Sequence, residues 1–224
     1  MKDFLTWMAH QRDDQVTFFD VFDIRDALLN KNTDDSTVVF VDIGGAKGHQ
    51  CVALKKRSPD LAGRVVLQDQ PEVLEEARTN PLPGFQGIET QAYNLWSPQH
   101  LKGNVFTARQ IIASILISDI GARSYYLRNV LHDWPDEKCI EMIRNIRVGM
   151  TEDSVLLIDE MVLPENGTSW RAAQMDVLMM STLAAVERTE AEWRSLFDRA
   201  GFKIVKTLAY NPHHHDAVLV AIPK

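Results

Sequence analysis

Short apolar runs rich in β-branched residues alternate along the chain with longer amphipathic stretches. This alternation is typical of a parallel sheet with helices on both of its faces. We expect strands at residues 37–42, 64–68, 87–93, 124–130 and 154–159. We expect helices at residues 48–57, 71–79, 135–148, 169–182 and 189–200. The last of these has the spacing of a capping box at Thr189 and Glu192, and it stops at Gly201, where a C-terminal glycine belongs.

Two extended segments, 202–208 and 217–222, follow the last helix and predict a terminal hairpin. The expected fold class is therefore α/β and Rossmann-like, with a mostly parallel seven-stranded sheet, helices on both faces and a C-terminal antiparallel hairpin. That hairpin distinguishes the architecture from a plain dinucleotide-binding fold.

Composition narrows the range of partners. The 224 residues suit one α/β domain, and a formal net charge of −7 disfavours nucleic acid and anionic lipid. No apolar run reaches the roughly 20 residues of a membrane span, and the N-terminus lacks a signal peptide, so we expect a cytoplasmic protein with a small-molecule partner. Cys51 and Cys139 lie far apart in no metal-binding pattern, and the histidines at 213–215 are interpreted as a solvated turn, so no metal site is expected.

A glycine-rich turn follows the first predicted strand. The segment VVFVDIGGAKG is a buried strand that runs into a turn and then a helix. The dinucleotide pattern GxGxxG would need glycine at position 43, but Ile43 is there. What remains is an acidic residue, Asp42, before Gly44, Gly45 and Gly48, a pattern typical of nucleoside-binding turns. The alternative is that these glycines only make a tight turn.

An acidic residue also ends the second predicted strand. Asp69 lies about 20 residues beyond the glycine turn, where nucleotide-binding α/β folds place a carboxylate that accepts hydrogen bonds from ribose hydroxyls. An aspartate before a proline can instead be a helix cap, and the sequence leaves both interpretations open.

A histidine stands at the end of the fourth predicted strand. His132 is followed by Asp133 and Trp134, and open α/β sheets bind ligands at the carboxyl ends of their strands. Since the ordinary pKa of histidine is about 6.5, His132 is suited to take a proton near neutral pH. The alternative role is to cap the following helix.

Two glutamates and two methionines complete the candidate site. Glu160 follows the next predicted strand and Glu187 precedes the capping box, so both carboxylates could orient one imidazole. Met175 and Met179 lie on the helix between them and are candidates to line an apolar substrate pocket. Surface positions for the glutamates and core packing for the methionines are the competing interpretations.

Five segments together resemble a known family. They are VDIGGAKGHQ, LQDQPEV, YYLRNVLHDWPDEKC, LLIDEMVLP and ERTEAEW. They look like the plant and fungal caffeate/flavonoid-type (class II) S-adenosylmethionine-dependent O-methyltransferases, most of all the fungal branch. The match runs from about Phe4 to the C-terminus, and HDWPDE followed by ERTEAEW is its most specific part. A Rossmann-like methyltransferase fold is the architecture that this resemblance implies.

The resemblance implies methyl transfer from S-adenosylmethionine to a hydroxyl of a small aromatic metabolite. It implies that His132 is the general base, oriented by Glu160 and Glu187, with Asp133 beside the substrate hydroxyl, and that no metal is needed. Alignment of the nucleophile with the methyl group would supply most of the acceleration. The positions assigned to cofactor binding are Asp42, Gly44, Gly45, Asp69, Asn94, Leu95 and Arg128.

The chain departs from the family pattern in several places. Residues 1–33 correspond to leading helices, a remnant of the linker to an N-terminal dimerisation domain, and 34–224 to the methyltransferase domain. A homodimer is expected to be weakened accordingly. Asn94 stands where the family usually has aspartate, and Ala46 replaces a glycine. The apolar stretch at about 104–120 is an atypical insert, which we interpret as translated intron sequence.

Two further hypotheses belong to other functional classes. A truncated, catalytically inactive relative that binds cofactor or a partner chain is favoured by the departures just described, whereas His132, Glu160 and Glu187 favour the enzyme. A nicotinamide-dependent oxidoreductase shares only the sheet architecture and is disfavoured by Ile43.

Overall fold

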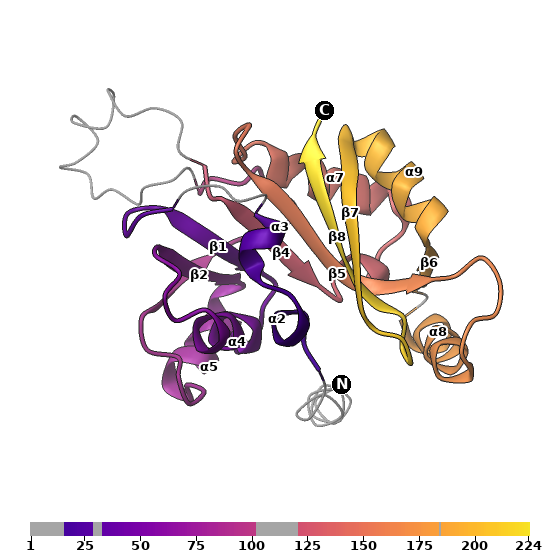
Figure 1. Ribbon diagram of the computed structural model, residues 1–224, viewed down its shortest axis with the longest axis horizontal. Coiled ribbons are helices and arrows are strands. Elements are labelled where there is room, and N and C mark those ends of the chain that lie inside the picture. Colours follow the sequence, from indigo (N-terminus) through magenta and orange to yellow (C-terminus); the bar gives the residue numbers. More distant parts are fainter. Residues whose placement is uncertain (1–15, 29–32, 102–120, 184) are drawn as a thin grey trace.

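A central sheet organises the molecule (Figure 1). The computed structural model describes residues 16–28, 33–101, 121–183 and 185–224, so the stretch at 104–120 and most of the leading segment lie outside the described residues. The strands are β1 (Val38–Ile43), β2 (Arg64–Asp69), β3 (Ile88–Ala92), β4 (Ser124–Arg128), β5 (Val155–Leu163), β6 (Arg188–Thr189), β7 (Phe202–Asn211) and β8 (Asp216–Pro223). Their order is β3-β2-β1-β4-β5-β8-β7, with β6 paired to β5 outside this path.

The sheet confirms the predicted fold class. The pairs from β3 to β5 are all parallel, and β8 is antiparallel to both β5 and β7. The hairpin therefore inserts its last strand between β5 and β7. Seven strands lie on the main path, and the two-residue β6 is an addition that the sequence pattern did not predict.

Helices cover both faces of the sheet (Figure 1). They are α2 (Phe18–Val21), α3 (Ile24–Ala27), α4 (His49–Arg57), α5 (Pro71–Thr79), α7 (Asp136–Arg147), α8 (Trp170–Leu183) and α9 (Glu190–Ala200), with the 3-10 turn η1 (Leu131–Asp133). One apolar core packs α7 and α9 against one face of the sheet. A second core packs α2, α3, α4 and α5 against the other face. Along β4, Tyr125 and Leu127 belong to the first core and Tyr126 to the second, as the two-residue period of a strand requires.

Local signals explain several of the boundaries. Thr189 caps α9 by accepting from the Glu192 backbone N–H, the Glu192 carboxylate accepts in return, and Gly201 ends the helix at φ +85°. Pro71 occupies the first turn of α5, where its missing N–H costs nothing.

Among the strand ends that differ from the sequence-based expectation, those of β4 and β5 bear on the site. β4 ends at Arg128 instead of 130, because Asn129 turns the backbone into the left-handed region at φ +51°. β5 continues past Asp159 to Leu163, because β8 pairs with it beyond that point. Glu160 therefore lies within a strand, where its side chain has a fixed direction. No helix within the described ranges is long and apolar enough to cross a membrane.

Candidate active site

The glycine-rich turn lies directly after β1, at the carboxyl edge of the parallel strands. Gly44 has φ +72°, and its backbone N–H donates to the carbonyl oxygen of Gln68 at 2.8 Å. A Cβ atom on Gly45 would lie 2.4 Å from the carboxylate of Asp42, so only glycine fits there. A Cβ atom on Gly44 would lie 3.1 Å from a methyl group of Val130, which places the turn beside the segment that carries His132.

Asp42 lies underneath this turn. Its side chain is buried, with 1% of the residue exposed, and the Cys51 thiol donates to Oδ2 at 3.5 Å. Burial raises the pKa of Asp42 from 3.8 to about 7. The carboxyl group thus supports the turn from below, and a direct role in cofactor binding stays a prediction.

Asp69 ends β2 next to the same turn. Its Oδ2 accepts from the backbone N–H of Ala46 at 2.9 Å, and its Oδ1 accepts from Gln70 N–H at 2.7 Å. Ala46 has φ +51°, a conformation that favours glycine. The aspartate is therefore oriented by the backbone of two loops, as an acceptor for ribose hydroxyls would need to be.

The loop after β3 carries two further positions predicted to bind the cofactor, Asn94 and Leu95. Asn94 Oδ1 accepts from the Trp96 backbone N–H at 3.1 Å, and the Leu95 carbonyl accepts from Asn145 Nδ2 at 3.0 Å. Trp96 packs edge to face on Trp134, with ring centroids 4.8 Å apart. This contact joins the loop to the turn that contains His132.

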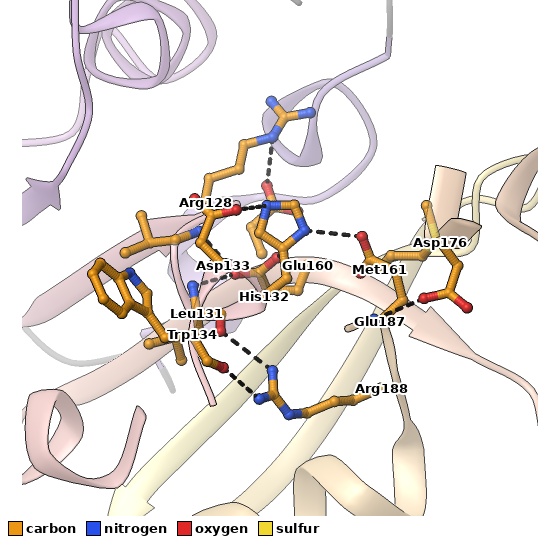
Figure 2. A network of polar contacts seen from close by, with 12 residues as sticks. Arg128, Leu131, His132, Asp133, Trp134, Glu160, Met161, Asp176, Glu187 and Arg188 are labelled. Carbon is orange, nitrogen blue, oxygen red and sulfur yellow. Dashed lines mark hydrogen bonds and ion pairs between the residues drawn. The ribbon is translucent and has the colours of Figure 1, made fainter. Parts of the chain in front are cut away.

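His132 lies at the centre of a buried polar cluster on η1 (Figure 2). Its Nδ1 is 2.9 Å from Oε1 of Glu187, and its Nε2 is 3.4 Å from Oδ1 of Asp133. Only 4% of His132 is exposed. The ring is thus oriented through Nδ1, and Nε2 is the nitrogen that faces Asp133.

Glu160 acts mainly on the backbone of this turn. Its Oε1 accepts from the backbone N–H groups of Val130 at 3.0 Å and Leu131 at 2.9 Å. Its Oε2 is 3.9 Å from Nδ1 of His132, an ion-pair distance and not a hydrogen bond. Glu187 is therefore the hydrogen-bonded partner of the imidazole, and Glu160 positions the chain on which it stands.

The three carboxylates change the acid–base chemistry of the imidazole. Burial alone lowers the pKa of His132, but Glu160, Glu187 and Asp133 outweigh burial and raise that pKa from 6.5 to about 9. Burial raises the pKa of Glu160 to about 7 and also raises the pKa of Asp133. One oxygen of each carboxylate is buried without a hydrogen-bond partner among the described residues: Asp133 Oδ1, Glu160 Oε2 and Glu187 Oε2. The cluster thus has more acceptor capacity than the chain itself uses.

Arg128 ends β4 with its side chain largely buried. Its Nε is 3.6 Å from Oδ2 of Asp159, and this carboxylate also accepts from the hydroxyl groups of Tyr126 and, at 2.8 Å, Tyr210. Burial opposes the charge, but Asp159 raises the pKa of Arg128. The guanidinium is held by β5, and its predicted contact with the cofactor remains a prediction.

Met175 and Met179 lie on α8, next to the segment that carries Glu187. Met179 is buried and Met175 is partly buried. The carbonyl of Met179 accepts from Ala185 N–H at 3.4 Å, and Asp176 Oδ1 accepts from Glu187 N–H at 3.1 Å. α8 therefore borders the cluster, as the methionine hypothesis requires, and contact with a substrate stays a prediction.

Two side chains that support the cluster were not predicted from the sequence. They are Asp176, which holds the Glu187 backbone, and Arg188, whose guanidinium bonds to the carbonyls of Leu131 and Trp134. Neither belongs to a spacing pattern that marks a site. Arg188 lies in the ERTEAEW segment that carries the family resemblance, but that segment gave no role to its guanidinium.

Comparisons with known proteins identify the family to which the chain belongs. A family model for the O-methyltransferase domain matches residues 24–203. The chain is 38% identical over 217 residues to the demethylsterigmatocystin 6-O-methyltransferase of Emericella nidulans. This alignment covers 97% of this chain and 93% of that protein. It is 40% identical over 187 residues to the enzyme of the same name from Aspergillus parasiticus, of which it covers 42%.

The solved structures extend the comparison to the fold. LepI in complex with SAM superimposes with a TM-score of 0.82 and 30% identity, covering 100% of this chain and 52% of that one. OxaC superimposes with a TM-score of 0.79 and 27% identity, covering 98% and 50%. The chain thus spans about half the length of several of its relatives. On the domain match and on the identity to the fungal enzymes, the chain belongs to the O-methyltransferase family.

Proposed function

We propose that this protein transfers a methyl group from S-adenosylmethionine to a hydroxyl of a small aromatic metabolite, with His132 as the general base. The observation that carries the proposal is the orientation of His132: Nδ1 lies 2.9 Å from Oε1 of Glu187, which leaves Nε2, on the side of Asp133 at 3.4 Å, as the ring nitrogen to meet an acceptor. A general base needs both a fixed ring and one nitrogen within reach of the substrate proton.

The residues present fit the cofactor. The glycine turn, with Gly44 at φ +72°, allows close approach of a ligand to the backbone, and Asp69 lies beside it. S-adenosylmethionine carries a positive sulfonium, which suits a cluster with three carboxylates and buried oxygens that have no hydrogen-bond partner. When bound, this cofactor supplies a methyl carbon activated for attack by an oxygen nucleophile and leaves as the neutral thioether.

The chain's own residues prepare that nucleophile. A phenol has a pKa of about 10, so little of it is ionised at neutral pH without a base. In its neutral form, His132 takes the hydroxyl proton at Nε2, and Glu187 stabilises the resulting imidazolium through Nδ1. Glu160 keeps the turn in place through the N–H groups of Val130 and Leu131.

Binding and transfer must be measured separately, because one solved relative is described as a pericyclic reaction enzyme. That structure is 31% identical to this chain with a TM-score of 0.81. Calorimetry with S-adenosylmethionine tests binding, and a labelled methyl-transfer assay on a panel of phenols tests turnover.

Two variants make the assay specific to the base. His132→Gln should bind S-adenosylmethionine and lose methyl transfer by roughly 100-fold or more. His213→Ala, which changes an exposed histidine of the turn between β7 and β8, should match the parent in both assays. If the parent chain binds S-adenosylmethionine but methylates none of the phenols in the panel, the proposed activity is contradicted and the hypothesis of a non-catalytic relative is supported.

A further inference from the structure

A buried arginine follows directly after Glu187. Arg188 is 2% exposed and forms the short strand β6 with Thr189, which pairs with the end of β5. A buried guanidinium is costly unless its donors are satisfied, so its partners show what the fold uses it for.

The Arg188 guanidinium forms hydrogen bonds to both ends of the turn that carries His132 (Figure 2). Its Nη1 donates to the carbonyl oxygen of Leu131 at 3.3 Å, and its Nη2 donates to the carbonyl oxygen of Trp134 at 2.8 Å. These two carbonyls stand on either side of His132 and Asp133. One rigid planar group therefore fixes the start and the end of the catalytic turn.

The remaining contacts hold the guanidinium itself. Nε donates to Oδ1 of Asp136 at 3.0 Å, and the ring of Trp193 lies 5.0 Å from the guanidinium carbon. Asp136 belongs to the first turn of α7, and Trp193 belongs to α9. The arginine is thus anchored to two helices before it reaches the turn.

From these contacts we infer that Arg188 is the positioning residue that fixes the His132 turn against Glu187. Arg188 and Glu187 are adjacent in the chain. The guanidinium that holds the backbone of the His132 turn and the carboxylate that holds Nδ1 of the ring therefore belong to one backbone segment. The Val186 N–H, which donates to the His132 carbonyl at 3.3 Å, strengthens the same link. The inference rests on the proposed role of His132 as the base.

Lysine cannot replace arginine in this position. The Leu131 carbonyl, the Trp134 carbonyl and the Asp136 carboxylate accept from Nη1, Nη2 and Nε of one planar guanidinium, whereas an ammonium presents its donors from a single point. Arg188→Lys keeps the charge and most of the volume while losing this geometry. Arg188→Met removes the charge as well. The matched control is Arg199→Met, since Arg199 also pairs with Asp136 but makes no contact with the turn carbonyls.

The test is a titration of the histidine ring signals by nitrogen-15 NMR on the full chain, with His132→Gln used to assign the signal of residue 132. In the parent and in Arg199→Met, the pKa of His132 should lie near 9. In Arg188→Lys it should fall toward 6.5, because a loosened turn no longer keeps the imidazole on Glu187. This readout does not depend on methyl transfer, so it can succeed or fail separately from the proposed function.

Kinetics provides the second readout. In Arg188→Lys, kcat should fall roughly 10- to 100-fold while the affinity for S-adenosylmethionine is kept, since misplacement of a base by about 1 Å has that effect. If folded Arg188→Lys keeps the parent pKa of His132 and the parent kcat, the arginine is only a structural residue and the inference is wrong. Should Arg188→Met fail to fold, the lysine variant still decides the question.

Discussion

Glu187→Gln is the substitution that tests the electrostatics of the site in most detail. Glutamine keeps the shape of glutamate and can still accept from Nδ1 of His132, but it removes the negative charge. Glu187 is the nearest carboxylate to the ring at 2.9 Å, ahead of Asp133 at 3.4 Å and Glu160 at 3.9 Å. The variant therefore removes the carboxylate charge that is hydrogen-bonded to the imidazolium.

The expected size of the effect of Glu187→Gln follows from how far the pKa of His132 is raised in the parent protein. The rise of the pKa of His132 from 6.5 to about 9 corresponds to about 3 kcal/mol of preference for the cation. A hydrogen bond to a charged group contributes about 1.5–3 kcal/mol, so the variant should lower the pKa of His132 by about 1 to 2 units. Glu160 and Asp133 remain and prevent a complete return to 6.5.

The direction in which kcat/KM changes with pH follows from the protonation state of His132, because a general base must be in its neutral form. In the parent, kcat/KM should rise with pH until the pKa of His132 is passed, and in Glu187→Gln the rise should be complete at lower pH. For stability, the raised pKa of His132 contributes fully below pH 6.5 and is lost as pH rises through about 9. Glu187→Gln should therefore destabilise more at pH 6 than at pH 10. Equal pH profiles for the two proteins would refute the reasoning.

Three further predictions concern the glycine turn. Ala46→Gly should raise the free energy of unfolding by up to about 1 kcal/mol in urea titrations, because φ +51° strains alanine. Gly45→Ala should lower it by about 1–3 kcal/mol, since the new methyl carbon would lie 2.4 Å from Asp42 and 2.7 Å from Leu67. The pKa of Asp42 is raised to about 7, so its charge costs stability as pH rises from 3.8 through 7. Asp42→Asn should thus stabilise the protein more at pH 8 than at pH 5, measured by thermal unfolding; a gain independent of pH would show that the carboxyl is not strained by burial.

The sequence pattern predicted most elements, because each has a local cause. The helix at Pro71–Thr79 matches the expected range, since proline marks its start, and the capping box marks the start of α9. The pattern missed β6, because two residues show no periodicity, and it ended β5 too early. The continuation of β5 depends on its pairing with β8, a contact between segments far apart in the chain.

The candidate site was predicted as a set of residues but not as an arrangement. The topology brings His132, Glu160 and Glu187 together beyond the end of β4. Glu187 bonds to the His132 ring and Glu160 bonds to the backbone of the turn. These different roles depend on distances that no sequence pattern contains. The role of Arg188 depends on carbonyl groups, which every residue has, so its neighbours in the chain could not indicate what it binds.

The central claim is that Nε2 of His132 reaches the acceptor hydroxyl. The most direct measurement is a crystal structure of the protein with S-adenosylhomocysteine and a phenol that it methylates. Nε2 should lie about 2.6–3.2 Å from the phenol oxygen, with Nδ1 still bonded to Glu187. A ring turned away from the acceptor, with another side chain on the phenol oxygen, would contradict it.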